Sequence, residues 1–170
     1  MKRTILGLIM LAVLLTSVLP AGAAGPRGSR DNPIPLGQSA RLPDGWVVKV
    51  TSPNPNAWRL IQAENQFNDP PKAGRTFFMV RLVGTYRGSK ARDILFESDF
   101  EAVGRSSVAY QTFDDSCGVI PNELPSKKVF QGGTVAGNAC WSVKKSDVGS
   151  LLMYWEDFIT EKAIFWRLRR

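Results

Sequence analysis

Short β-rich segments, separated by turn residues, follow one another along most of this 170-residue chain. The clearest of them begins after Gly74, where large apolar side chains of one parity predict a buried strand face: Phe78, Val80, Leu82 and Tyr86. Another strand is expected at 46–51, because turn-forming residues precede and follow this segment. Further strands are expected at 100–103, 108–113, 135–143, 151–155 and 163–168. About seven or eight short strands with no internal repeat predict an all-β domain, an antiparallel β-sandwich.

One segment, 56–64, leaves its secondary structure open. Ala57, Ile61 and Glu64 have the three-and-four spacing of a helix, whereas the residues from Trp58 to Gln62 also alternate as in a strand. The side chains expected to anchor the core are mostly aromatic: Trp46, Phe78, Val80, Leu82, Phe100, Trp141, Tyr154, Trp155 and Trp166. We interpret these aromatics as packing residues rather than as a binding platform.

The first 23 residues have the pattern of a secretory signal peptide. Lys2 and Arg3 precede an uncharged, mostly apolar run at 5–19, and small residues follow Pro20. Cleavage is expected after Ala23, and a retained N-terminal anchor is the less favoured alternative, because the run is shorter than a membrane span. This pattern predicts secretion, either extracellular or periplasmic.

The chain that remains after cleavage is expected to be one domain. Residues 24–36, rich in proline and glycine, are expected to be a flexible, exposed N-terminal segment, and 37–170 the β-sandwich domain. The leader contains two of the 22 basic residues and none of the 15 acidic residues, so the remainder has a net charge of +5. Such a charge favours weak attraction to anionic polymers or membrane surfaces and does not imply nucleic-acid binding.

Cys117 and Cys140 are the only cysteines, and an even pair in an exported chain predicts one structural disulfide. The chain contains no histidine. This excludes Ser-His-Asp triads, thiols activated by histidine, and metal or haem ligation by imidazole. Phosphate-binding and dinucleotide-binding glycine motifs are also absent from the sequence. We therefore expect no enzymatic activity and no cofactor.

Several motifs of the chain occur together in one bacterial family. They are GWVV at 45–48, AENQFNDPPKAG at 63–74 leading into FFMVRL at 77–82, CGVIP at 117–121, GGTVAG before Cys140-Trp141, and AIFWRL at 163–168. From about Gly37 to the C-terminus, the chain resembles a secreted family of unknown function with a telokin-like, immunoglobulin-type sandwich, which includes secreted immunoprotective antigens and many lipoproteins. The resemblance implies an immunoglobulin-like β-sandwich and export, and brings no catalytic residues. Many relatives carry a lipobox cysteine that this chain lacks, which favours free secretion.

Two polar clusters are candidate contacts for a ligand or cation. In the first, Asn65, Asn68 and Asp69 present side-chain oxygens, although these residue types also shape turns through backbone hydrogen bonds. The second is an acidic strand face formed by Glu97, Asp99 and Glu101. Asp114 and Asp115 are a candidate addition to it. Its carboxylates are also the one plausible pair for glycoside hydrolysis, but a solvated strand face accounts equally for their spacing.

A basic stripe is the third candidate. Arg81 and Arg87 share one parity of an expected strand, and Arg167 and Arg169 share one parity of the last. If these two strands are neighbours, the four side chains form a contact for an anionic polymer; the alternative is that they guard strand edges against aggregation.

These observations predict a secreted, non-catalytic binding or interaction module of the cell envelope or extracellular space. Its partner is expected to be an extracellular or envelope protein or polymer. Two alternatives stay open: a structural accessory protein of an envelope assembly, and a cation-dependent carbohydrate binder or hydrolase that uses the acidic strand face.

Overall fold

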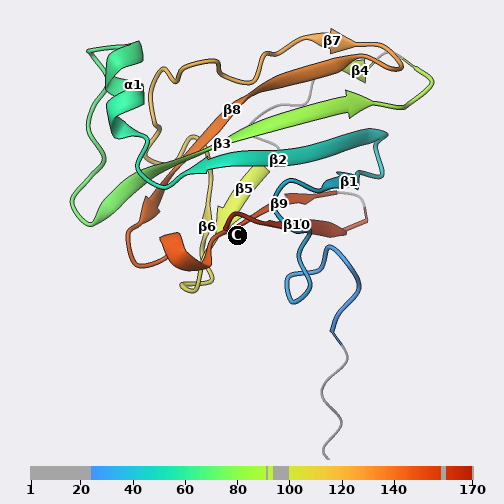
Figure 1. Ribbon diagram of the computed structural model, residues 1–170, viewed down its shortest axis with the longest axis horizontal. Coiled ribbons are helices and arrows are strands. Elements are labelled where there is room, and N and C mark those ends of the chain that lie inside the picture. Colours follow the sequence, from blue (N-terminus) through green and yellow to red (C-terminus); the bar gives the residue numbers. More distant parts are fainter. Residues whose placement is uncertain (1–23, 91, 94–99, 158–159, 170) are drawn as a thin grey trace, which may run out of the picture.

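The computed structural model describes residues 24–90, 92–93, 100–157 and 160–169 of the chain (Figure 1). The first four-stranded sheet has the order β1-β2-β3-β8, with bounds β1 Ser39–Arg41, β2 Trp46–Asn54, β3 Arg75–Tyr86 and β8 Thr134–Lys144. The second has the order β10-β9-β5-β6, with bounds β5 Phe100–Val103, β6 Ala109–Tyr110, β9 Leu152–Glu156 and β10 Ala163–Arg167. The remaining elements are the paired strands β4 Arg92–Asp93 and β7 Lys128–Val129, the helix α1 Trp58–Glu64 and the 3-10 turn η2 Val148–Ser150.

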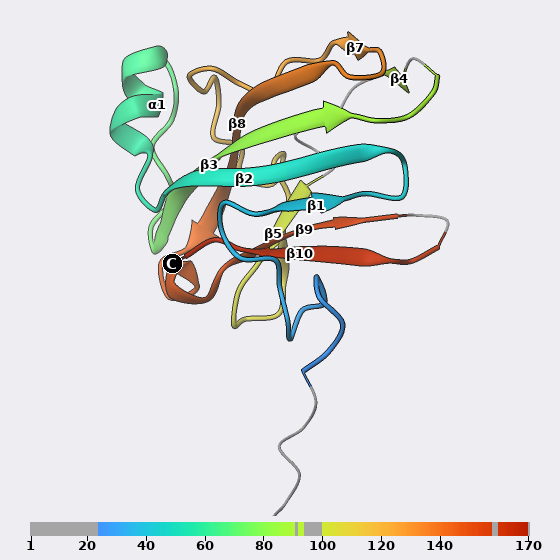
Figure 2. The same ribbon diagram turned by 45° about the vertical axis from the view of Figure 1, so that its right-hand side comes forward.

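The two sheets face each other across one apolar core, and every strand pairing within them is antiparallel. Figure 2 shows the two layers from a second side. In β3, the parity expected to be buried does face the core, where Phe78 lies opposite Trp141 and Val80 opposite Ala139. The fold is therefore the predicted antiparallel β-sandwich.

The other face of β3 carries a second, smaller apolar cluster. It is covered by α1, which decides the open question at 56–64 in favour of a helix. Its buried members are Ala57, Ile61, Phe77, Met79, Cys117, Ile120 and Cys140. We name this set the outer cluster. A helix forms here because Ala57 and Ile61 lie four residues apart on the face that meets β3.

Residues 24–36 differ from the exposed segment that we expected. Ile34 is only 4% exposed and packs in the main core. Its N–H donates to the carbonyl of Phe165 at 2.8 Å, and its carbonyl accepts the N–H of Arg167 at 2.8 Å. The exposed edge of β10 is thus covered by this segment, because an unpaired strand edge needs hydrogen-bond partners.

Two further expectations are corrected. Tyr154 is half-buried on the outer face of β9, where its ring stacks on Phe165; the other eight expected anchors are buried in the main core. The strand expected at 108–113 is only the two residues of β6. Turn residues follow at once, so the segment leaves the sheet after Tyr110.

Candidate functional site

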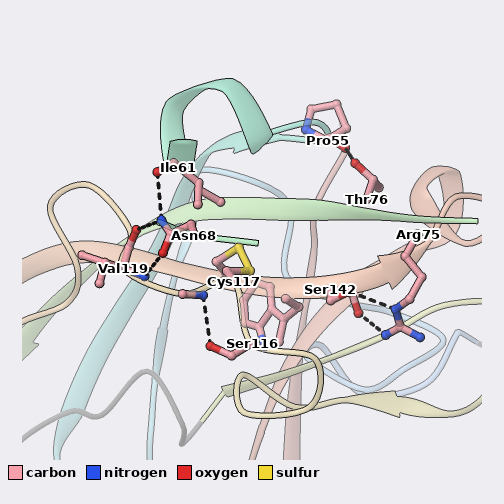
Figure 3. Close-up of a disulfide and its surroundings, with 12 residues drawn as sticks. Pro55, Ile61, Asn68, Arg75, Thr76, Ser116, Cys117, Val119 and Ser142 are labelled. Atoms are coloured by element: carbon pink, nitrogen blue, oxygen red, sulfur yellow. Dashed lines mark hydrogen bonds between the residues drawn. A yellow bond between two sulfur atoms is a disulfide. The ribbon is translucent and has the colours of Figure 1, made fainter. Parts of the chain in front are cut away.

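The predicted disulfide between Cys117 and Cys140 is present and joins the loop after β6 to the outer face of β8 (Figure 3). Cys140 lies opposite Met79 in the sheet, so the bond is formed inside the outer cluster. It closes a separation of 23 residues. The disulfide has a structural environment, because both cysteines are almost fully buried among apolar side chains.

Asn68 fastens the same loop to the chain that follows α1. Its side-chain amide donates to the carbonyls of Ile61 and Val119 at 2.9 and 2.8 Å, and its carbonyl oxygen accepts the N–H of Val119 at 2.9 Å (Figure 3). Asn65 accepts the N–H of Phe67 at 3.1 Å, as in an asparagine turn. These hydrogen bonds engage the side-chain oxygens of both asparagines with backbone. A ligand contact that uses them together with the exposed Asp69 stays a prediction.

Of the acidic strand face, the structure describes Glu101. Glu97 and Asp99 lie outside the described residues. Glu101 lies on β5, where its carboxylate accepts hydrogen bonds from the Tyr154 hydroxyl and from the Gln111 amide, the latter at 2.9 Å. Burial, together with this carboxylate, raises the pKa of Tyr154 well above its usual range. Within the part of the chain that the structure describes, no group of three or more acidic or cysteine side chains is arranged to hold a metal ion.

The four arginines of the expected basic stripe lie on different sheets. Arg81 is exposed on the outer face of β3, and Arg87 directly follows that strand. Arg167 ends β10 and Arg169 comes two residues later, both with the parity that points away from Trp166 in the core. Because the two sheets turn their inner faces to each other, Arg81 on the first sheet and Arg167 on the second lie on opposite outer faces. The four arginines therefore do not form the single stripe that we expected.

A buried carboxylate that no sequence pattern singled out lies at one end of the sandwich. Asp147 is 1% exposed, and its oxygen accepts hydrogen bonds from the Ser106 hydroxyl, the Ser106 N–H at 3.3 Å and the Tyr110 hydroxyl at 2.8 Å. Burial opposes its ionisation, but these hydrogen bonds outweigh burial and lower the pKa of Asp147 below its ordinary value. A side chain at Gly104 would collide with this carboxylate. These hydrogen bonds connect the turn after β8 to Ser106 and Tyr110, so the role of Asp147 is structural.

Asp115 is a second carboxylate that the chain itself engages. It forms ion pairs with Lys72 and with Arg75, the latter at 3.5 Å, and the hydrogen bond from Lys72 is the main reason why the pKa of Asp115 is lowered. Arg75 also donates to the hydroxyl of Ser142 at 2.9 Å and lies over the ring of Tyr110 at 5.5 Å. Arg75, Tyr110 and Asp115 are among the residues that line a small cavity of about 270 Å³, where Arg75 and Asp115 form an ion pair.

A groove of about 620 Å³ lies between the turn after β1 and the beginning of β10, and these two strands are edge strands of their sheets. We name it the β1–β10 groove. Three segments form its walls: residues 26–29, the turn between β1 and β2 at 41–45, and residues 162–164 at the beginning of β10. Pro26, Leu42, Pro43 and Ile164 give it an apolar surface. No sequence pattern indicated this site, because its walls come from three distant parts of the chain.

Basic side chains surround the apolar surface of the groove. Arg27, Arg41 and Lys162 belong to its lining, all three are exposed, and none of the described lining residues is acidic. The Arg27 guanidinium donates to the side-chain carbonyl of Gln38, which fixes it at the rim. Arg87 lies next to one end of the groove, since its N–H donates to the carbonyl of the lining residue Gly45 at 2.9 Å. The arrangement can bind an apolar group and a negative charge side by side.

In the described residues, no helix has the length and apolar character needed to cross a membrane. No protein-family model matches the chain, and no curated protein matches it. Its fold is similar to that of solved structures. The secreted protein MPT63 of Mycobacterium tuberculosis has a TM-score of 0.54 at 13% identity, and the match covers 79% of this chain and 97% of MPT63.

Two proteins of Bacillus subtilis are also similar in fold. The yjhA protein has a TM-score of 0.55 at 8% identity, with 80% of this chain and 99% of yjhA covered. The ycdA protein has a TM-score of 0.53 at 12% identity, with 75% of this chain covered; the match spans only 37% of ycdA. At these identities the likeness concerns the fold alone. The chain thus has a β-sandwich fold in common with these bacterial proteins, one of them secreted.

Proposed function

We propose that this protein is an exported, non-catalytic binding module that takes up its ligand in the β1–β10 groove. The groove carries the proposal, because its volume of about 620 Å³ lies within the range of about 300–1,000 Å³ that is typical of ligand sites. Its apolar walls and few basic groups also have the composition of such sites. Export is supported by the signal-peptide pattern, by the disulfide and by the fold likeness to a secreted protein.

The absence of catalysis is part of the proposal. Asp147, Asp115 and Glu101 are each engaged by hydroxyl, amide or cationic groups of the chain itself. A general acid or base needs a proton-transfer partner in a substrate site, and these carboxylates are occupied by structural contacts. The full sequence also lacks histidine, the most frequent catalytic base.

Capture of a partner tests this function. The protein recovered from culture fluid is immobilised and exposed to envelope extract and culture fluid of the producing cell, at low and at high salt. Ala163→Trp, which fills the groove, is the test variant, and Ala163→Ser is the control that preserves its size. We expect a retained molecule whose capture the tryptophan abolishes and the serine preserves. If neither the protein nor the control retains anything, a structural accessory role replaces the binding module.

A second candidate, carbohydrate binding, is favoured by one observation. The rings of Tyr154 and Phe165 stack at 5.3 Å on the outer face of the second sheet, beside Glu101. Half-exposed aromatic rings beside a carboxylate are suited to sugars. Affinity electrophoresis in soluble polysaccharides, with Tyr154→Ala as the variant, distinguishes this candidate from the groove. Retardation that Tyr154→Ala abolishes and Ala163→Trp leaves intact supports it.

A further inference from the structure

We infer that the β1–β10 groove binds a single acyl chain of an anionic phospholipid, with the lipid phosphate held by Arg27, Arg41 and Lys162. The inference rests on the proposed function and names the ligand class of its site. It follows from two properties of the groove: which of its polar groups are engaged by the chain, and where its charges lie.

The walls of the groove offer few backbone groups to a ligand. On one wall, the N–H of Gly28 donates to Asn32 at 2.7 Å and its carbonyl accepts the N–H of Phe165 at 2.8 Å. On the turn, the N–H of Leu42 donates to Trp46 at 2.7 Å and that of Gly45 donates to Leu42 at 3.1 Å. An extended peptide that adds to a sheet needs such groups free. An acyl chain needs none, and it gains from burial against the apolar walls.

The apolar surface is continuous with the main core. Ile164 is half-buried and packs against the core, and Leu42 at the other wall is 1% exposed. Gly28 is buried beside Ile164, where its φ of +91° favours glycine, and a Cβ there would make ordinary van der Waals contact with the side chains of Ile164 and Ile34. A ligand in the groove therefore contacts a rigid apolar surface rather than mobile polar side chains.

The charges at the rim select a negatively charged head group. Two guanidinium groups and one ammonium group supply the hydrogen-bond donors that bind phosphate, and a guanidinium alone has five N–H groups. Two carboxylates next to lining residues in sequence, Asp44 and the exposed Glu161, offset part of this positive charge. The Asp44 carboxylate accepts the N–H of Trp46 at 3.2 Å, which turns one oxygen toward its own turn. The charged residues of the lining itself are all basic, so their charge complements a phosphate.

The probe is lysophosphatidylglycerol below its micelle concentration, with binding to the protein from culture fluid measured by calorimetry. Three ligands serve as comparisons: glycerol phosphate, which lacks the chain; lysophosphatidylcholine, which lacks net charge; and a poly-glutamate peptide. We expect binding of the anionic lysolipid, weaker binding of the neutral one, and no binding of the other two. The N-terminus is determined by mass spectrometry, so that an uncleaved leader is not measured as a binding site.

Two double variants with the same change in charge test the position of the site. Arg41→Glu with Lys162→Glu should weaken lysolipid binding by at least about tenfold. Arg59→Glu with Lys145→Glu, on α1 and after β8, should leave binding within about twofold. Ala163→Trp should abolish binding, and its folding is checked by thermal unfolding.

Several outcomes overturn the inference. They are absence of lysolipid binding, equal losses in both double variants, or binding of glycerol phosphate or poly-glutamate as strong as that of the lysolipid. The proposed function is tested separately. If the capture experiment retains a partner in a groove-dependent way while the lysolipid fails to bind, the binding module stands and the lipid assignment is wrong.

Discussion

The outer cluster and the β1–β10 groove are both apolar surfaces outside the main core, and the chain treats them in opposite ways. The outer cluster is covered by α1, closed by the disulfide and fastened by Asn68. The groove is left open, and its rim carries only basic charges among the lining residues described. An apolar surface costs free energy when it stays in water. The covered outer cluster is thus explained by stability. The open apolar surface of the groove, beside basic side chains, is the basis of the binding function that we propose.

The largest effect is expected where the outer cluster is closed covalently. Replacing Cys117 and Cys140 by alanine should lower the free energy of unfolding by about 3 kcal/mol, because the unfolded chain is released from a loop whose ends are 23 residues apart. Denaturant unfolding measures the change. Reduction of the unaltered protein should give a similar loss; a loss below about 1 kcal/mol would show that the disulfide does not stabilise the outer cluster.

A smaller loss is expected at the hydrogen-bonded fastening of the same cluster. Asn68→Ala removes three hydrogen bonds and leaves the carbonyl of Ile61 and both backbone groups of Val119 without this partner, at a cost of about 2 kcal/mol. Hydrogen exchange of the Val119 amide should accelerate. Asn65→Ala, which removes one exposed turn bond, is the matched control and should cost less than about 1 kcal/mol. Equal effects of the two variants would contradict the special role of Asn68.

The pH dependence of stability separates the closed end of the sandwich from the groove. The pKa of Asp147 is lowered in the folded state below its ordinary value of 3.8, so its contribution is fully present well above that pH. It is lost as the pH falls through the lowered folded pKa. Asp147→Asn should lower the free energy of unfolding by about 1 kcal/mol at neutral pH. Between about pH 4 and pH 2, the free energy of unfolding of this variant should depend less on pH than that of the wild type, as measured by denaturant unfolding at each pH. Asp115 shifts in the same direction, so Asp115→Asn is the comparison.

The smallest effect is expected at the rim of the groove. Arg41→Glu with Lys162→Glu changes exposed charges and should alter the free energy of unfolding by no more than about 0.5 kcal/mol. Thermal unfolding of this variant beside the wild type measures it. A loss above about 1 kcal/mol would mean that these charges hold the N-terminal segment in place, and the contrast between a closed and an open apolar surface would fail.

The parts of the fold that depend on local pattern were predictable. Residues of β3 alternate with period two, so the buried parity followed from the sequence. The disulfide followed from two cysteines in a chain whose first residues have the sequence pattern of an export leader. The helix at 58–64 did not follow, because a seven-residue segment fits either period, and only its packing against Phe77 and Met79 decides between them.

The candidate sites were less predictable. Parity correctly placed Arg81 outside the core, but whether β3 and β10 are neighbours depends on strand order, which single-strand patterns do not contain. Tyr154 is a large aromatic residue of the kind expected in a core. The parity of β9 instead places its side chain on the outer face of the sheet, where its hydroxyl donates a hydrogen bond to Glu101. The signal that could have drawn attention to residues 26–34 was a large apolar side chain, Ile34, among prolines and glycines.

The sequence by itself determined the sandwich class, the buried face of the long strand and the pairing of two cysteines, because each depends on short-range periodicity or on composition. Tertiary structure alone decided the β1–β10 groove, the separation of Arg81 from Arg167 and the burial of Asp147. The groove brings together Arg41 and Lys162, which are more than 100 positions apart in the sequence. The hydrogen bond that engages Asp147 joins it to Ser106, 41 positions away. The order in which strands pair sets such distances, and pairing depends on the whole core at once.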